Sequence, residues 1–262
     1  MSSTSSQRSA KEGLHSAKDD HHGVSRVHVH GEGGEYVTIN GQKYYRHELM
    51  AAFGGTLNPG VSPYPQNRMN PAPVGLSGFA LTTIVLSLFN AQAMGIVVPN
   101  VVVSLACMYG GALQFLTGLL EFATGNTFGC TALTSYGAFW ISYAAIFIEA
   151  FGIEEAYQKD ASQMENAVGF FLIGWAIFTF VLVLNTLKST VAFFSLFFFL
   201  FITFVLLAGG AFSGHVGVTR AGGVFGVITG FIAWYNAFAG TATKANSYIV
   251  AHPIPLPAFK RD

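Results

Sequence analysis

The side chains that could do chemistry in this sequence are neutral hydrogen-bonding groups that stand inside long apolar runs. Charged groups in such surroundings are costly and mark tightly coupled ion sites, but with one exception these side chains carry no charge. Hydroxyls and amides of this kind suit a small polar solute that passes between apolar walls. They are Thr82, Thr83, Asn90, Gln92, Gln114, Thr117, Thr131, Thr134, Ser135 and Tyr136.

Glu121 is the exception, and a turn with the sequence TGNT follows it at 124–127. Two interpretations of its carboxylate are equally consistent with the sequence. The carboxylate could cap the turn at Asn126 and Thr127, or it could have a proton-linked role inside the apolar run. Both interpretations stay open at this point.

Enzymatic motifs are missing from the sequence. No Ser-His-Asp arrangement, HExxH motif, phosphate-binding loop or dinucleotide-binding motif occurs in a usable context. Glu149 and His215 fall near the ends of apolar runs, where water reaches them. The sequence therefore predicts a protein that is not an enzyme and that binds no cofactor.

Long apolar runs must position the polar groups. Hydrophobic residues make up 52% of the chain and charged residues 10%, whereas about a quarter of an average soluble domain is charged. A net charge of zero gives no basic surface for nucleic acid. Six runs approach the roughly 20 residues that cross a bilayer, which predicts an all-α membrane protein with six transmembrane helices in a bundle. The runs are 74–93, 97–123, 128–151, 168–187, 191–212 and 222–240.

The first run begins at the sequence NPAPVGL, residues 70–76. Proline is tolerated in the first turn of a helix, because its missing N–H would have no partner there. Asn70 is a favoured N-cap residue, so Asn70, Pro71 and Pro73 together predict the start of a helix.

Glycines recur every four residues in the last run, at Gly222, Gly226 and Gly230. Small residues at this spacing let helix backbones approach closely in a membrane. Packing within one chain is the simpler expectation, and an interface between subunits is the alternative.

Two polar segments, 1–69 and 242–262, flank the apolar region. An even number of spans places both on the same side of the membrane, and basic residues favour the cytoplasmic side. Every Lys and Arg except Lys159 and Arg220 falls on the side of these two segments. We therefore expect both termini to be cytoplasmic, with Lys159 and Arg220 in outer loops.

The first polar segment is expected to be largely disordered because it holds few apolar residues. A small hairpin over 36–45 is the expected exception, since β-forming residues flank an Asn-Gly pair. The histidines of this segment lack the spacing and partners of a metal site, so no metal is predicted. They are His21, His22, His28 and His30.

Short motifs follow one another through residues 70–240. They are NPAPVGL at 70–76, GFALTT at 78–83, YGG at 109–111, GLLE at 118–121, GNTFG at 125–129, TSYGAFW at 134–140 and GWAIFT at 174–179. In content and order they resemble the acetate uptake transporter family, which includes bacterial succinate–acetate permeases and fungal Ato-type acetate carriers. The long polar first segment and the ending with PIPLP at 253–257 resemble the fungal branch.

This resemblance implies a homohexamer in the plasma membrane, in which each subunit has its own path for acetate, succinate or other short carboxylates. The constriction of the family falls on Phe79, Tyr136 and Leu200, and a position that modulates selectivity falls on Ala233. The signature and the polar lining of the path are expected at Asn70, Pro71, Pro73, Thr82, Thr83, Gln114, Glu121, Asn126, Thr127 and Thr134.

A proton is the expected partner of the solute, because an ionised carboxylate would lose its hydration in an apolar gap. Two other functions stay open from the sequence. One is a membrane receptor or signalling protein that uses the first polar segment, and the other is the export of ammonia or ammonium.

Overall fold

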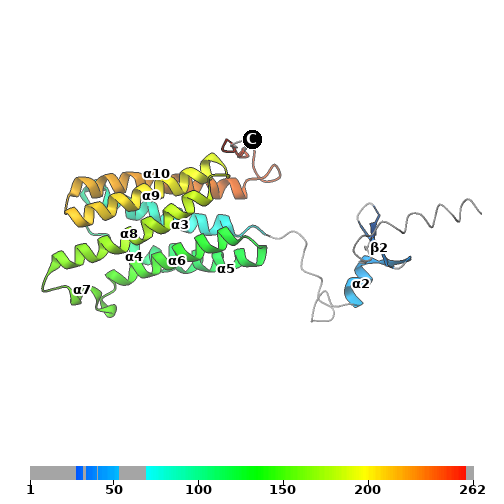
Figure 1. The fold of residues 1–262 in the computed structure, drawn as a ribbon, viewed down its shortest axis with the longest axis horizontal. Helices are drawn as coiled ribbons and strands as arrows, with labels where there is room; N and C mark the ends of the chain where they lie inside the picture. Colours follow the sequence, from blue (N-terminus) through cyan, green and yellow to red (C-terminus); the bar gives the residue numbers. More distant parts are fainter. Residues whose placement is uncertain (1–27, 32–33, 40, 53–68, 258–262) are drawn as a thin grey trace, which may run out of the picture. The chain divides into compact units, whose positions relative to one another are not determined.

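The structure of the chain is a computed structural model that describes residues 28–31, 34–39, 41–52 and 69–257 (Figure 1). The chain divides into two compact units, Met1–Asn67 and Arg68–Asp262. The predicted disorder of residues 1–27, with His21 and His22, lies outside the described residues.

The smaller unit holds a three-stranded antiparallel sheet with the order β1-β2-β3. Ile39 pairs with Gln42, so β2 and β3 occupy the segment predicted as a hairpin. The Lys43 ammonium lies 3.9 Å from the centre of the Tyr36 ring, a cation–π contact between the same two strands. The elements are β1 (His28–His30), β2 (Tyr36–Ile39), β3 (Gln42–Tyr45) and the helix α2 (Arg46–Ala52).

The larger unit is a bundle of long helices (Figure 1), in which α10 packs along α3 and α9, and α8 packs along α9. The segments α4, η2 and α5 follow one another without a loop, and η2 is a π-helical turn between them. The elements are α3 (Ala72–Asn90), η1 (Ala93–Gly95), α4 (Val102–Cys107), η2 (Met108–Leu113), α5 (Gln114–Thr124), α6 (Thr127–Phe147), η3 (Glu149–Phe151), α7 (Ile153–Ala156), α8 (Ala161–Asn185), α9 (Val191–Ser213) and α10 (Val216–Thr241).

Five helical segments of the described residues are long and apolar enough to cross a membrane. They are Ala72–Asn90, Val102–Thr124, Ser162–Asn185, Val191–Ser213 and Val216–Thr241. The remaining predicted span falls on α6, which has 21 residues and so has sufficient length. Its hydroxyl-bearing residues, Thr131, Thr134, Ser135 and Ser142 among them, lower its hydropathy.

The first two residues of the signature form a cap that differs from the prediction. Pro71 occupies the N-cap position of α3, and Asn70 lies one residue earlier. The Asn70 side-chain oxygen still accepts a hydrogen bond from the Ala72 N–H, at 3.1 Å. One of the otherwise unpaired N–H groups of the first turn is satisfied in this way.

The starts of α4, α8 and α10 also differ from the prediction. Helix α4 begins at Val102, after the expected residue 97, because Pro99 disfavours a helical conformation at the residue before it. Helix α8 begins at Ala161, before the expected residue 168, because Asp160 accepts a hydrogen bond from the Ser162 N–H at 3.1 Å and caps the helix. Hydrogen bonds from the side chains of Ser162 and then Gln163 hold the pKa of Asp160 below its ordinary value. Helix α10 begins at Val216, so Arg220 lies on a helix and the loop predicted for it was wrong.

The glycines of α10 pack within the chain, as the simpler expectation had it. A Cβ atom at Gly226 would overlap with the side chain of Ser87, and one at Gly230 would overlap with Ile84. Both neighbours belong to α3. The glycine spacing therefore brings α10 and α3 into close contact, which fixes one wall of the bundle interior.

Candidate functional site

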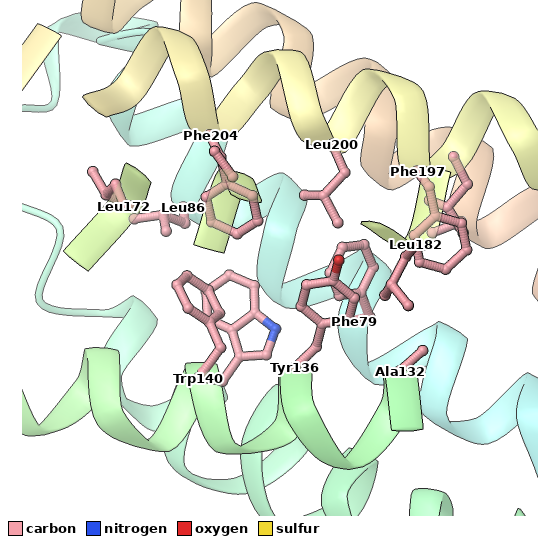
Figure 2. Packing of buried hydrophobic residues seen from close by; sticks show 14 of the residues in the cluster. Phe79, Leu86, Ala132, Tyr136, Trp140, Leu172, Leu182, Phe197, Leu200 and Phe204 are labelled. Atoms are coloured by element: carbon pink, nitrogen blue, oxygen red, sulfur yellow. The ribbon is translucent and has the colours of Figure 1, made fainter. Parts of the chain in front are cut away.

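The three residues of the expected constriction lie together in the centre of the bundle. Phe79 on α3, Tyr136 on α6 and Leu200 on α9 expose only 4%, 3% and 3% of their surfaces. The ring centroids of Phe79 and Tyr136 are 5.6 Å apart. Figure 2 shows Leu200 pointing from α9 toward these two rings. Three helices that are distant in sequence thus contribute one apolar layer.

The hydroxyl of Tyr136 forms a hydrogen bond with another side chain of the protein. Its oxygen lies 2.8 Å from Oγ1 of Thr179 on α8. Since the Thr179 hydroxyl donates to the Trp175 carbonyl oxygen at 2.7 Å, Tyr136 is the donor to Thr179. This bond fixes the orientation of the Tyr136 ring beside Phe79.

A cavity of about 210 Å³ begins at this layer, with Phe79 and Leu200 in its wall. Side chains from α3, α6, α8, α9 and α10 line it. A water molecule needs only ~10–15 Å³ on this measure, so the cavity has room for a small solute and several waters.

Burial of the lining residues changes from one end of the cavity to the other. Near the centre of the bundle, Phe79, Leu200 and Trp140 are almost completely buried. At the other end, Asn90 and Thr219 are half-buried. The cavity therefore extends from the Phe79 layer to the end of the bundle where α3 finishes and α10 begins.

Two residues of the cavity wall carry buried polar atoms that have no hydrogen-bond partner. These atoms are Oγ1 of Thr83 and Nε1 of Trp140, and their residues expose 5% and 1% of their surfaces. A buried polar group without a partner is costly, so these atoms favour a bound polar ligand. A hydroxyl and an indole N–H can each donate one hydrogen bond, and a carboxylate oxygen can accept such a bond.

The cavity wall is uncharged, because none of the described residues that line it is Asp, Glu, Lys or Arg. In the part of the chain that the structure describes, no group of three or more metal-ligating side chains occurs. The site therefore offers hydrogen bonds and apolar contacts to a solute.

Several residues expected in the polar lining serve helix packing, away from the cavity. Thr82 donates to the carbonyl oxygen of Gly78 at 2.8 Å, and Gly110 of η2 packs against its side chain. Thr134 donates to the carbonyl oxygen of Cys130 in its own helix. Each hydroxyl is satisfied within its own helix, as is common for Thr in helices.

Expected site residues at the N-terminal ends of α3 and α6 also lie outside the cavity wall. Pro73 is buried, and a Cβ atom at Gly240 would overlap with it, so the signature packs against the end of α10. Pro71 is half-buried and Thr127 is exposed. Ala233 is fully buried on α10, and it too does not line the cavity.

One carboxylate oxygen of Glu121 caps the turn at Asn126, and the other has no hydrogen-bond partner. Its Oε2 atom accepts a hydrogen bond of 2.6 Å from the Asn126 amide, and the Asn126 side-chain oxygen accepts from the Gly129 N–H of α6 at 3.0 Å. The other carboxylate oxygen is buried and has no partner. Gln114, also fully buried, has no partner for either amide atom. Neither residue lines the cavity.

Trp140 is the member of the site that the sequence interpretation did not single out. It follows Tyr136 by four residues on α6, so the two side chains share a face of that helix. This spacing was the available signal, since one face of α6 carries both the constriction residue and the unpartnered indole N–H.

Comparisons with known proteins agree with this architecture. Residues 53–258 match the model of the GPR1/FUN34/yaaH family. The chain is 57% identical to ammonia transport outward protein 2 of Saccharomyces cerevisiae, over 90% of this chain and 84% of that protein. It is 46% identical to acetate permease A of Emericella nidulans, over 80% and 74% of the two chains.

A solved structure is similar as well. The bacterial acetate channel SatP superposes with a TM-score of 0.60 at 36% identity, and the match covers 66% of this chain and 92% of the other.

Proposed function

Because the chain belongs to the GPR1/FUN34/yaaH family, we propose that this multi-pass membrane protein transports acetate and other short carboxylates, succinate among them. The names of an acetate permease and of a bacterial acetate channel among its relatives support the proposal. The plasma membrane is the proposed location, with both termini in the cytoplasm.

The observation that carries the proposal is the pair of unpartnered donors in an uncharged cavity. Thr83 Oγ1 and Trp140 Nε1 can each donate a hydrogen bond to a carboxylate oxygen, while the apolar wall around Phe79 accommodates the methyl group of acetate. A solute of this size and polarity fits the site better than a large or cationic one.

The layer of Phe79, Tyr136 and Leu200 is the proposed constriction. Its apolar side chains resist the passage of water and ions. An ionised acetate that entered the layer would lose its hydration at a large cost in free energy, so we propose that a proton accompanies it. Acetic acid resembles the Asp and Glu side chains, with a pKa of about 4–5, and acidic surroundings should therefore favour uptake.

The remaining assignments are part of the same proposal. We propose that α6 is the sixth span, that residues 70–241 form the transport domain, and that the chain assembles as a homohexamer. Exposed apolar side chains on α5, Leu116 and Leu120 among them, are available to lipid or to another copy. Ala233 is the proposed selectivity position. Glu121 is the proposed proton-linked group, since one of its oxygens has no partner.

Flux of labelled acetate into vesicles that contain the purified protein tests this function. We expect acetate uptake to depend on the protein and to be reduced by competing unlabelled succinate. Uptake should fall as the external pH rises from about 5 to 7, because the protonated fraction of acetate falls. A flat profile over this interval would contradict the proton linkage, and equal flux in empty vesicles would contradict acetate transport itself.

Export of ammonia is the second candidate, because a relative with 57% identity has the name of an ammonia transport protein. The cavity wall has no carboxylate to hold an ammonium ion, which favours the acid. The same vesicles distinguish the two candidates. Flux of labelled methylammonium without flux of acetate would support the second.

A further inference from the structure

We propose that Arg220 captures the carboxylate anion at the wide end of the cavity, before the solute reaches Thr83 and Trp140. This inference rests on the proposed transport of carboxylates. It adds a residue that attracts the charged form of the solute, whereas the cavity itself is uncharged.

Two residues that line the cavity are close in sequence to Arg220 or to its hydrogen-bond partner, and they locate Arg220 near the wide end. It follows Thr219, which lines the cavity from α10. Its guanidinium donates from Nε to Oε1 of Gln92 at 3.0 Å, and a second guanidinium N–H also donates to this oxygen. Gln92 lies two residues after Asn90, which lines the cavity from α3. Arg220 and Gln92 do not themselves line the cavity, but their bond joins the segments that follow these two lining residues, near the wide end.

The backbone around the wide end is closely packed. A Cβ atom at Gly223 would overlap with the Ala91 N–H and with the Ser87 carbonyl group, so only glycine lets the first turns of α10 meet the end of α3. Gln92 adopts φ 55° and ψ 38°, a left-handed conformation that is uncommon for residues other than glycine. In this conformation the side-chain oxygen of Gln92 accepts both hydrogen bonds from the Arg220 guanidinium.

The charge of Arg220 has no counterpart nearby in the sequence. Helices α3 and α9, the rest of α10 and the connection at 91–101 contain no other Asp, Glu, Lys or Arg. His215, the N-cap residue of α10, is the titratable residue at the start of this helix, and it is exposed. Among the described residues, the guanidinium bonds only to the neutral Gln92 amide, so most of its five N–H groups remain available to an anion.

The position of Arg220 on its helix is unfavourable for stability alone. A cation near a helix N-terminus is repelled by the positive end of the helix dipole. Acidic residues also lie at the start of α8, where Glu165 precedes the cavity-lining Val168 by three residues. Arg220 and the helix dipole together therefore provide one local positive point at which an anion can bind. The carboxylate would arrive hydrated and charged at Arg220 and then move inward to the two uncharged donors.

Initial uptake of labelled acetate by cells that express the protein tests the proposal, at a fixed pH of about 7, where acetate is ionised. The variants are Arg220→Gln, Arg220→Lys, Gln92→Ala and, as the matched control, Lys159→Gln, each normalised to its surface abundance. One unit charge near contact in water supplies about a fivefold effect. We therefore expect Arg220→Gln to raise KM about fivefold at low salt, with the maximal rate unchanged.

Salt separates an electrostatic role from a structural one. At ~1 M salt the screening length is ~3 Å, so the KM of the wild type should rise to that of Arg220→Gln. We expect Arg220→Lys and Lys159→Gln to stay within about twofold of the wild type, because a charge remains at the wide end in both. Equal KM values for Arg220→Gln and the wild type at low salt would overturn the proposal.

The Gln92→Ala variant keeps the charge but loses the bond that positions it. A rise in KM as large as that of Arg220→Gln, together with no effect of salt, would mean that the guanidinium acts only through the loop, and the proposal would be wrong. A wild type without acetate uptake would instead contradict the proposed function, and that result is read independently of the variants.

Discussion

The two halves of the helix bundle differ in how they fill the space on either side of the Phe79, Tyr136 and Leu200 layer. The half that contains the cavity is here termed the open half. In the other half, termed the packed half, aromatic rings occupy the interior. Phe128 lies 5.5 Å from Phe193 and 5.3 Å from Phe197 between ring centroids, and Figure 2 shows Phe197 on that side of Leu200.

Helices α6 and α9 contribute to both halves, and aromatic rings occur in both, since Phe139, Trp140, Tyr143 and Phe204 line the cavity of the open half. In the packed half, rings of α6 and α9 meet one another. In the open half, small side chains such as Ser87, Thr203 and Ala211 face the interior and leave space between the helices. Under the proposed function, we expect a solute to bind in the open half and its passage to require movement of the rings in the packed half. Binding and permeation are separate steps in this account.

Filling the open half should have the largest effect. Ala211 lines the cavity near its wide end, and the large ring system introduced by Ala211→Trp would occupy much of the space there. We expect acetate uptake to fall about tenfold or more at normal surface abundance, since the solute would have no room to bind. Ala138, which is exposed on α6, provides the control. Ala138→Trp should leave uptake nearly unchanged, and an equal loss in both variants would argue against a role for the cavity.

Widening the layer between the halves should change selectivity. Leu200→Ala removes three carbon atoms from a buried site and should lower the free energy of unfolding by about 2–5 kcal/mol. The extra space should help lactate and succinate compete with labelled acetate, while acetate uptake changes less. Phe198, 41% exposed on the same helix, is the control. If Phe198→Ala broadens selectivity as much as Leu200→Ala, the constriction is assigned to the wrong face of α9.

Removing one donor of the open half should weaken binding moderately. Thr83→Val keeps the shape of the side chain but loses the hydroxyl, and a hydrogen bond of this kind contributes about 1 kcal/mol, or about fivefold in KM. Thr82→Val is the matched control, because the Thr82 hydroxyl already donates to the Gly78 carbonyl oxygen. A KM for Thr83→Val equal to that of Thr82→Val would remove the hydroxyl from the binding site.

The smallest effect is expected for Tyr136→Phe. The lost hydroxyl donates to Thr179, which keeps its own bond to the Trp175 carbonyl oxygen. We expect the free energy of unfolding to fall by about 1 kcal/mol, and the KM for acetate to change less than about twofold, since the remaining ring still fills the layer. A large rise in KM would mean that the solute binds the Tyr136 hydroxyl, and that the boundary between the halves belongs to the binding site.

The sequence predicted the long helices but misplaced three of their starts, those of α4, α8 and α10. Apolar runs of sufficient length are visible without a structure, whereas a helix start depends on single local bonds. Asp160 caps α8 through the Ser162 N–H, which the hydropathy of the run does not reveal. Gly214 has φ 65° and ends α9, so the turn is complete before Val216 and Arg220 falls on α10.

The cavity was less predictable than the layer beside it. The family resemblance indicated Phe79 and Tyr136, and the structure brings them together. Thr82 and Thr83 are adjacent and chemically identical, yet only Thr83 faces the cavity. This difference depends on the close approach of Gly110 to Thr82, a contact between helices that sequence spacing does not specify. The same holds for Trp140, whose N–H lacks a partner only because of how five helices meet.

Tryptophan fluorescence of the purified protein tests most directly whether the open half binds the carboxylate. The chain has three tryptophans, and only Trp140 lines the cavity. A Trp175→Phe, Trp234→Phe protein retains Trp140 alone, and a Trp140→Phe, Trp175→Phe protein retains Trp234, which is 37% exposed on α10. Titration with acetate should shift the Trp140 emission saturably, at concentrations near the KM for uptake, and leave the Trp234 emission unchanged. A Trp140 emission that does not respond at concentrations that saturate uptake would contradict binding in the open half.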